Sequence, residues 1–333
     1  MNSFGTLYRL SIFGESHGPA VGITVDGCPA GINLSADDFS SDIERRKGGI
    51  QKGTTPRTEA DIPVFLSGVF NGKTTGAPLT IIFENSNTRS SDYEKQRSIP
   101  RPGHADFVAS QKFGGYEDYR GGGHFSGRLT VCLVAAGVIA KKLLSVYGDI
   151  NCQATLIEAG AEKDIEAGLQ KAIDAKDSIG GIVECRVNGL PIGLGEPFFN
   201  TLESLISHAV FAIPAIRGIE FGTGFAAASM FGSDHNDALE DKSGKTRTNH
   251  AGGVVGGLTN GNELVFRVAV KPTSSTPKEQ HSLNIETGKM EDFSVKGRHD
   301  LCIALRVPVV LEAVTACVLA DMLLQSQAIK RIG

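Results

Sequence analysis

The 333-residue sequence has no tryptophan and no excess of basic residues. Its 33 lysines and arginines are outnumbered by 37 aspartates and glutamates, so the formal net charge is −4. Proteins that bind nucleic acid or anionic membranes generally need a net or clustered basic surface. We therefore expect neither nucleic acid nor a membrane as a partner, and any anion-binding site must be local.

The sequence also lacks the cysteine spacings of metal and redox sites. Its six cysteines fall at no CxxC or zinc-finger spacing, and most stand in apolar runs, as buried free thiols do. The chain does not begin with a basic stretch followed by an apolar one, and no uncharged run of 18 or more apolar residues occurs in it. We expect a cytoplasmic protein that holds no metal.

Common nucleotide and zinc motifs are missing as well. No G-x-G-x-x-G follows an expected strand and no HExxH occurs, so a Rossmann dinucleotide site and a zincin site lack support. The segments 73–74 and 245–246, both Lys-Thr, resemble the end of a P-loop. Ser67 and Leu239 stand where the first glycine of that motif is needed, so we expect ordinary turns at both segments.

Glycine, in contrast, is abundant, with 41 residues in the chain, against about 7% of residues in an average protein. Many of these glycines gather in two short clusters, RGGGHFSG (120–127) and HAGGVVGG (250–257). Such clusters usually mark backbone that must come close to something else.

Apolar periodicity predicts strands and helices that interleave along the chain. The expected strands are 6–13, 20–26, 62–70, 77–84, 152–158, 181–187, 216–221 and 263–271. The expected helices begin near 35 and 105 and span 128–146, 162–176, 201–212 and 310–324. The regular alternation of a doubly wound sheet is absent and no linker divides the chain, so we expect one α+β domain over 1–333.

The motif GESHG (14–18) matches G-x-S-x-G, the nucleophile elbow of serine hydrolases. That elbow must lie between a buried strand and a helix, after an oxyanion-hole strand has already been built. Here only 13 residues precede the motif, and Pro19 and a strand-like run follow it. A serine hydrolase is therefore an unlikely alternative.

Two other segments indicate an anion site. Ser126 and Arg128 lie where a glycine-rich loop enters the apolar helix at 128–146, which brings backbone N–H groups, a positive helix end and a guanidinium together. AVKPTSS (269–275) ends a strand with a lysine and three hydroxyl groups that can bind a polar ligand. Taken alone, the second segment is better explained as a polar loop at the end of a strand.

Three histidines, His17, His104 and His124, stand in glycine- or proline-rich loops. Their reference pKa of about 6.5 allows them to gain or lose protons at cellular pH. Asp300 follows Arg298 and His299. An aspartate beside an arginine is usually a structural ion pair, but near a ligand it can act as a base.

Six motifs occur along the chain in the order found in the chorismate synthase family. They are FGESHG (13–18), RPGHAD (101–106), DYRGGGHFSGR (118–128), NHAGG (249–253), KPTSS (271–275) and GRHD (297–300). The sequence resembles this family over nearly its whole length, and six motifs in register are far more specific than any one of them.

The resemblance implies a fold and an activity. The implied fold is a β-α-β sandwich of antiparallel sheets around buried helices, assembled as a homotetramer. The implied enzyme is a carbon–oxygen lyase that removes phosphate and the C6 proton from 5-enolpyruvylshikimate 3-phosphate in an anti-1,4 elimination, giving chorismate in the last step of the shikimate pathway. The family requires reduced FMN (FMNH2) although there is no net redox change, and FMN can lie in a fold without a Rossmann motif.

The resemblance also implies site residues by matched position. His17 is expected beside the departing phosphate as a proton donor, His104 beside the flavin, where it helps set the ring's protonation state, and Asp300 next to the flavin N5. The residues expected to bind the anionic substrate are Arg46, Lys52, Arg101, Ser126 and Arg128. Those expected around FMN are His124, Phe125, Ser126, Ala215, Gly256, Lys271, Pro272, Thr273, Ser274, Ser275 and Arg298.

The chain departs from the family pattern at two places. Lys52 stands where many relatives have an arginine, and a lysine keeps the charge but loses the bidentate fork. His124-Phe125 stands where others often have Arg-Ser.

Some longer relatives carry an NAD(P)H:FMN reductase activity; this chain has no added segment, so we expect FMN to be reduced by a separate flavin reductase. The remaining alternative is a non-catalytic protein that binds a phosphorylated ligand.

Overall fold

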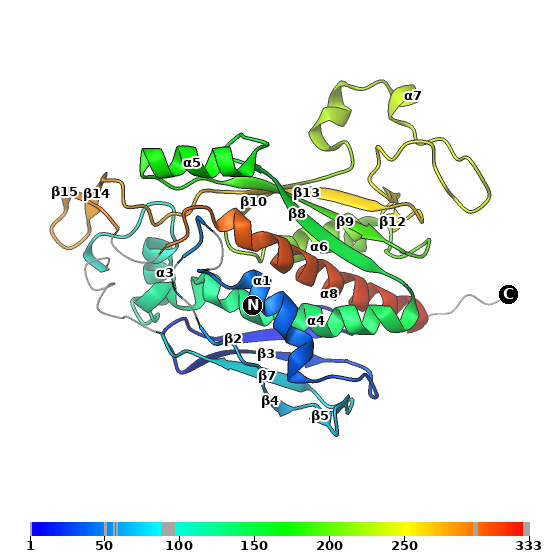
Figure 1. The fold of residues 1–333 in the computed structure, drawn as a ribbon, viewed down its shortest axis with the longest axis horizontal. Coiled ribbons are helices and arrows are strands. Elements are labelled where there is room, and N and C mark those ends of the chain that lie inside the picture. Colours follow the sequence, from blue (N-terminus) through cyan, green and yellow to red (C-terminus); the bar gives the residue numbers. More distant parts are fainter. Residues whose placement is uncertain are drawn as a thin grey trace.

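Two antiparallel sheets form the outer layers of the protein (Figure 1). The computed structural model describes residues 2–49, 52–55, 57, 59–87, 97–295 and 299–328. In the first sheet the order is β1 (Ser3–Phe4), β2 (Arg9–Gly14), β3 (Ala20–Asp26), β7 (Leu79–Glu84) and β4 (Val64–Ser67). In the second it is β10 (Ile216–Phe221), β13 (Leu264–Val270), β9 (Gly181–Asn188) and β8 (Asn151–Ala159).

Two long helices, α4 (Thr130–Tyr147) and α8 (Val307–Ala328), lie between the sheets and pack against each other (Figure 1). Helix α4 contacts β3 and β7 of the first sheet, and α8 contacts β8 and β9 of the second. Both are long and apolar enough to cross a membrane by length and composition, but they are mostly buried inside the protein, as core helices are. The expected antiparallel sandwich around buried helices is confirmed.

The remaining elements surround this core. The other helices are α1 (Ser40–Arg46), α3 (Asp106–Phe113), α5 (Ile165–Ala175), α6 (Leu202–Val210) and α7 (Gly232–His235). Short 3-10 turns are η1 (Ala36–Phe39), η3 (Arg120–Phe125), η4 (Gly127–Leu129), η5 (Phe198–Asn200), η6 (Gly224–Ser229) and η7 (Ile303–Arg306). The buried apolar side chains form one cluster that includes residues of both sheets, α4 and α8. Such a shared core is what the expected single domain over 1–333 requires.

Most elements lie where the periodicity predicted them, with two instructive differences. The expected strand 62–70 is split at Gly68 into β4 and β5 (Val69–Phe70). Strand β5 pairs with β6 (Lys73–Thr74) across Asn71-Gly72, both at positive φ as a tight hairpin turn requires. Segment 73–74 is therefore a strand, not the expected turn.

Besides β1 and β6, four short strands of the described residues were not predicted. The pair β11 (Val254–Val255) and β12 (Leu258–Thr259) and the pair β14 (Gln280–Asn284) and β15 (Lys289–Phe293) are separate two-stranded ribbons. Their sequences are too short or too polar to give an alternating apolar pattern, which explains why periodicity did not detect them.

The N-terminal segment is attached to the core through a buried carboxylate. Asp321 on α8 accepts hydrogen bonds from the backbone N–H groups of Thr6, Leu7 and Tyr8, at 2.9, 2.7 and 2.8 Å. The Tyr8 hydroxyl donates to the Ala136 carbonyl of α4 at 2.8 Å. These contacts fix the start of β2 against both central helices.

The two central helices approach closely at a glycine. A Cβ atom added to Gly137 on α4 would lie 2.3 Å from the Ala313 Cβ on α8 and 2.4 Å from its Cα. No side chain fits there without separating the helices.

We predict that Gly137→Ala lowers the free energy of unfolding by about 1–3 kcal/mol through overpacking, despite the better helix propensity of alanine. Urea denaturation measures this change. Ser145→Ala, at an exposed position of the same helix, is the control and should stay within about 0.5 kcal/mol of wild type. Equal stability of the two variants would show that this contact is not tight.

Candidate active site

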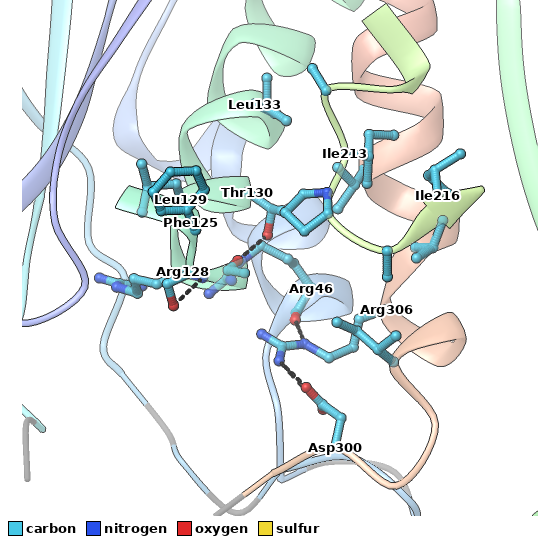
Figure 2. Close-up of a pocket in the computed structure, with 18 of the residues that line it drawn as sticks. Arg46, Phe125, Arg128, Leu129, Thr130, Leu133, Ile213, Ile216, Asp300 and Arg306 are labelled. Carbon is cyan, nitrogen blue, oxygen red and sulfur yellow. Dashed lines mark hydrogen bonds and ion pairs between the residues drawn. The ribbon is translucent and has the colours of Figure 1, made fainter. Parts of the chain in front are cut away.

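A cavity of about 700 Å³ opens between the first sheet, the start of α4, the α6–β10 connection and the start of α8. Its described lining is strongly cationic although the whole chain is acidic. The basic side chains are Arg46, Lys47, Arg57, Arg101, Arg128, Arg217, Lys271 and Arg306, and the carboxylates are Glu59, Asp61 and Asp300. In Figure 2, Arg46, Arg128, Arg306 and Asp300 lie on one side of the cavity, with the apolar Leu133, Ile213 and Ile216 on the other.

A buried carboxylate joins two of these arginines. The Asp61 side chain has no exposed surface; its Oδ2 accepts from Arg46 Nη2 at 2.5 Å, and its Oδ1 accepts from Arg128 Nη1. Burial alone would raise the Asp61 pKa, but the charges of Arg46 and Arg128 lower it below its usual value. The pair of guanidinium groups is therefore held by a permanent negative charge.

Two donor nitrogens of the Arg46 guanidinium group make no hydrogen bond within the described part of the protein. Its Nε and Nη1 are buried and have no hydrogen-bond partner among the described residues. Burial, followed by the charge of Arg306, lowers the Arg46 pKa to about 10, which still leaves the guanidinium charged at neutral pH. Buried charged donors without a partner are costly, and a bound anion would satisfy them.

A second ion pair lies beside this one. Arg306 donates to Asp300 Oδ2 through Nη1 at 3.0 Å and to the Arg46 carbonyl through Nε at 2.7 Å. Asp300 Oδ1 accepts from the Thr55 backbone N–H at 2.8 Å. Asp300 is thus fixed in the cavity wall by Arg306 (Figure 2).

The segment that precedes α3 carries a compact polar group. Arg101 donates to Asp106 through Nε (2.7 Å) and Nη2 (2.8 Å), and to Ser275 Oγ through Nη1 (3.1 Å). His104 Nδ1 lies 2.6 Å from Asp106 Oδ1. The favourable partners outweigh the effect of burial and hold the Asp106 pKa far below its usual value.

His17 lies at the edge of the cavity, behind the glycine loop at 121–123. It is 9% exposed and is not one of the lining residues. A Cβ added to Gly121, which has φ +61°, would lie 2.4 Å from the His17 Cδ2, so only glycine allows this approach. Burial, then the charges of Arg57 and Arg120, lowers the His17 pKa.

Ser16 does not have the surroundings of a hydrolase nucleophile. It is fully buried, and its hydroxyl accepts a hydrogen bond from Arg57 Nη1 at 3.1 Å. GESHG lies between the paired strands β2 and β3, so no helix follows it. The geometry excludes the nucleophile elbow.

Comparisons with known proteins agree over the whole chain. A family model described as chorismate synthase matches residues 8–324. A protein named chorismate synthase from Chitinophaga pinensis is 70% identical, over 100% of this chain and 99% of its own length. The chain belongs to the chorismate synthase family. Proteins of the same name from Dehalococcoides mccartyi and Methanocaldococcus jannaschii are 43% and 40% identical, over 99% and 98% of this chain and 99% and 97% of their own length.

A solved structure supports the fold. It is described as a crystal structure of chorismate synthase and superposes with a TM-score of 0.75 at 25% identity, over 97% of this chain and 93% of that chain.

The structure brings most of the residues expected from the chorismate synthase family to the one cavity. Those that line it are Arg46, Arg101, His104, His124, Phe125, Ser126, Arg128, Ala215, Lys271, Pro272, Thr273, Ser274, Ser275 and Asp300. His124 Nδ1 lies 2.7 Å from the Gly14 carbonyl, which places a proton on Nδ1. Lys271 Nζ donates to Ser274 Oγ at 2.5 Å, and that hydroxyl donates to the Gly103 carbonyl at 2.7 Å.

Besides His17, two of the expected residues that the structure describes do not line the cavity. Lys52 is exposed, and its Nζ donates to Gln170 on α5 at 2.9 Å, outside the cavity lining. Gly256 lies in the turn between β11 and β12, also outside the lining. Arg298 lies outside the described residues. In this structure neither Lys52 nor Gly256 takes part in the cavity.

The sequence reasoning missed the carboxylates that hold the arginines. Glu59 accepts from Arg57 Nε and Nη2 at 3.1 and 2.7 Å, Asp61 joins Arg46 to Arg128, and Asp106 binds Arg101. The close spacing of Arg57, Glu59 and Asp61 was the available signal, but Asp61 has a positive φ, so a simple alternation of an extended strand does not describe this segment.

We predict that Asp61→Asn lowers the free energy of unfolding by about 3–5 kcal/mol, because it leaves two buried guanidinium groups without their counter-ion. Urea denaturation at neutral pH measures the loss. The control is Asp26→Asn, which breaks the exposed Arg9–Asp26 pair and should cost less than about 1 kcal/mol. Similar costs for the two variants would contradict the structural role of Asp61.

The lowered pKa of His17 gives stability a specific pH dependence. The unfolded protein binds a proton at His17 near pH 6.5 while the folded protein resists it, so stability is lost as the pH falls through that value. We predict that the free energy of unfolding falls between pH 7.5 and 5.5 and that His17→Gln reduces the fall. His281→Gln, at an exposed histidine, is the control; if both variants gave the same profile, the burial of His17 would not matter.

Proposed function

We propose that this protein catalyses the anti-1,4 elimination of phosphate and the C6 proton from 5-enolpyruvylshikimate 3-phosphate, giving chorismate, with reduced FMN bound in the cationic cavity. The observation that carries the proposal is the buried Arg46, which has two unpartnered donor nitrogens and lines a cavity rich in guanidinium groups. The substrate is a trianion, and membership of the chorismate synthase family supports the choice of this reaction.

The cavity has the chemistry that the cofactor needs. Leu129, Leu133, Ile213 and Ile216 supply an apolar wall for a flat ring, and the segment 271–275 supplies a lysine and hydroxyl groups for the polar tail. Lys271, Ser274 and Ser275 would hold FMN there. Reduced FMN, when bound, supplies the electron density and the proton acceptor that this elimination requires.

The arginines would act on the leaving phosphate. Negative charge develops on the phosphate oxygens as the C–O bond breaks, and Arg46 and Arg128 are already fixed by Asp61, so they need little reorganisation. Removing one such preorganised donor typically raises the barrier by about 3 kcal/mol.

His17 would donate a proton to the departing phosphate. Its pKa is lowered in the ligand-free protein by burial and by Arg57 and Arg120. A phosphate dianion beside the ring would favour the imidazolium and oppose those cations. We propose that His17 becomes protonated when the substrate binds. His104 and Asp300 would assist proton transfer at the flavin.

The proposal also covers the compartment, the oligomeric state and the source of the reduced flavin. We propose a cytoplasmic homotetramer that takes FMN reduced by a separate flavin reductase. All six cysteines are free and buried, which fits a reducing compartment.

We predict that anaerobic incubation with chemically reduced FMN and 5-enolpyruvylshikimate 3-phosphate yields chorismate absorbance and free phosphate in equal amounts. His17→Ala should lose most of the rate, since general acid catalysis contributes about 100-fold or more, while Ser16→Ala should retain turnover. Absence of both products from the wild type would overturn the proposal.

A second arm tests the source of the reduced flavin. NADPH with oxidised FMN and no added reductase should give no turnover; chorismate formation under those conditions would contradict the proposed external reductase.

A further inference from the structure

Asp106 lies where it contacts two cavity side chains but not the cavity itself. It occupies the first turn of α3, and its carboxylate binds Arg101 through two hydrogen bonds and His104 at 2.6 Å. Its Oδ2 also accepts from the Arg101 backbone N–H at 3.1 Å. Four contacts from two residues therefore meet on one carboxylate.

The short His104–Asp106 distance determines where the imidazole proton lies. A ring nitrogen and a carboxylate oxygen 2.6 Å apart must share a proton, since two lone pairs would repel at that separation. Neutral His104 therefore carries its proton on Nδ1. Its Nε2 is then the atom that can accept a proton.

Arg101 does not replace Asp106 as the partner of the ring. Its Nη2 lies 3.0 Å from His104 Nδ1 and 3.3 Å from Nε2. The lone-pair directions of the two ring nitrogens diverge, so one donor cannot point along both. The guanidinium therefore contacts the ring beside the carboxylate and does not take its place.

Two cavities meet at His104. The ring lines the large cavity and also a smaller one of about 80 Å³, where the charged lining groups besides Asp106 are Arg97, Glu117 and Asp118. Asp106 lines the small cavity and, among the described lining, not the large one. A ligand in the large cavity is therefore influenced by Asp106 only through His104 and Arg101.

We propose that Asp106 is a positioning residue that locks Arg101 and His104 into one unit, with the His104 proton on Nδ1 and with Nε2 left as the proton-accepting atom of the ring. This inference rests on the proposed function for its catalytic consequence. Its structural part concerns the ligand-free protein, so it can be tested without turnover. This role also explains the tight turn at 101–104 that precedes α3. The turn brings the side chains of Arg101 and His104 next to the carboxylate of Asp106 in the first turn of the helix.

The test is an NMR measurement of the His104 tautomer in the ligand-free protein, with its signals assigned by loss in His104→Gln. In the wild type, the ¹⁵N shifts should show a proton on Nδ1 at neutral pH. Asp106→Asn keeps the shape but can turn an NH2 donor toward Nδ1, so the share of His104 that carries its proton on Nδ1 should fall and the share on Nε2 should rise. Glu166→Gln, which removes a first-turn carboxylate from α5 outside both cavities, is the control and should leave His104 unchanged.

Turnover supplies the second readout. Asp106→Asn should lower kcat about tenfold or more and change the pH profile of kcat, while Asp106→Glu should restore part of both. An unchanged His104 tautomer in Asp106→Asn would overturn the proposal. If Asp106→Asn changes the tautomer but the wild type forms no chorismate, the result counts against the proposed function alone.

Discussion

The structure depends on arginines held inside the protein by buried carboxylates. Burying a guanidinium group costs much free energy unless a partner of opposite charge compensates it. That partner then also fixes the orientation of the guanidinium group. Asp61 does this for Arg46 and Arg128, Asp106 for Arg101, and Asp300 for Arg306. Asp61 is shared by two arginines, and Arg46 has unpartnered donors. One of the two positive charges therefore has no counter-ion in this cluster, and this is the charge that the proposed anionic substrate would meet.

The fold brings these charged residues together from distant parts of the chain. Arg46 ends α1, Asp61 precedes β4, Arg128 precedes α4 and Arg306 precedes α8. The close contact of Gly137 with Ala313 sets the distance between α4 and α8, whose N-terminal ends both border the cavity. A second buried carboxylate on α8, Glu312, binds Lys141 of α4 at 3.1 Å and so links the same two helices; it also binds Arg45 of α1 at 2.7 Å. Packing and electrostatics therefore support one another at the same end of the helices.

Much of the fold was predictable because its elements are long and regular. The apolar runs gave α4, α8 and β10 within a few residues, and the ordered motifs gave the family and its antiparallel sandwich. The loops were harder. Ser16 in GESHG satisfies a hydrolase pattern, and only its complete burial and its bond from Arg57 exclude that role.

The pairing of the charges could not be predicted from the sequence. Asp61 and Arg128 are 67 positions apart, and nothing local distinguishes this buried pair from a solvated one. Lys52 shows the converse: matched to a family position, it instead reaches Gln170 on α5. Contacts of this range depend on how the sheets and helices pack, which short motifs do not encode.

The central claim is that Arg46 supplies the anion-binding donors of the cavity. It is tested most directly by calorimetric titration of 5-enolpyruvylshikimate 3-phosphate into the wild type and Arg46→Lys, which keeps the charge but loses the fork of donors. Lost charge-assisted hydrogen bonds, at about 1.5–3 kcal/mol each, should weaken binding about tenfold or more. Equal affinity for the two proteins would contradict the account.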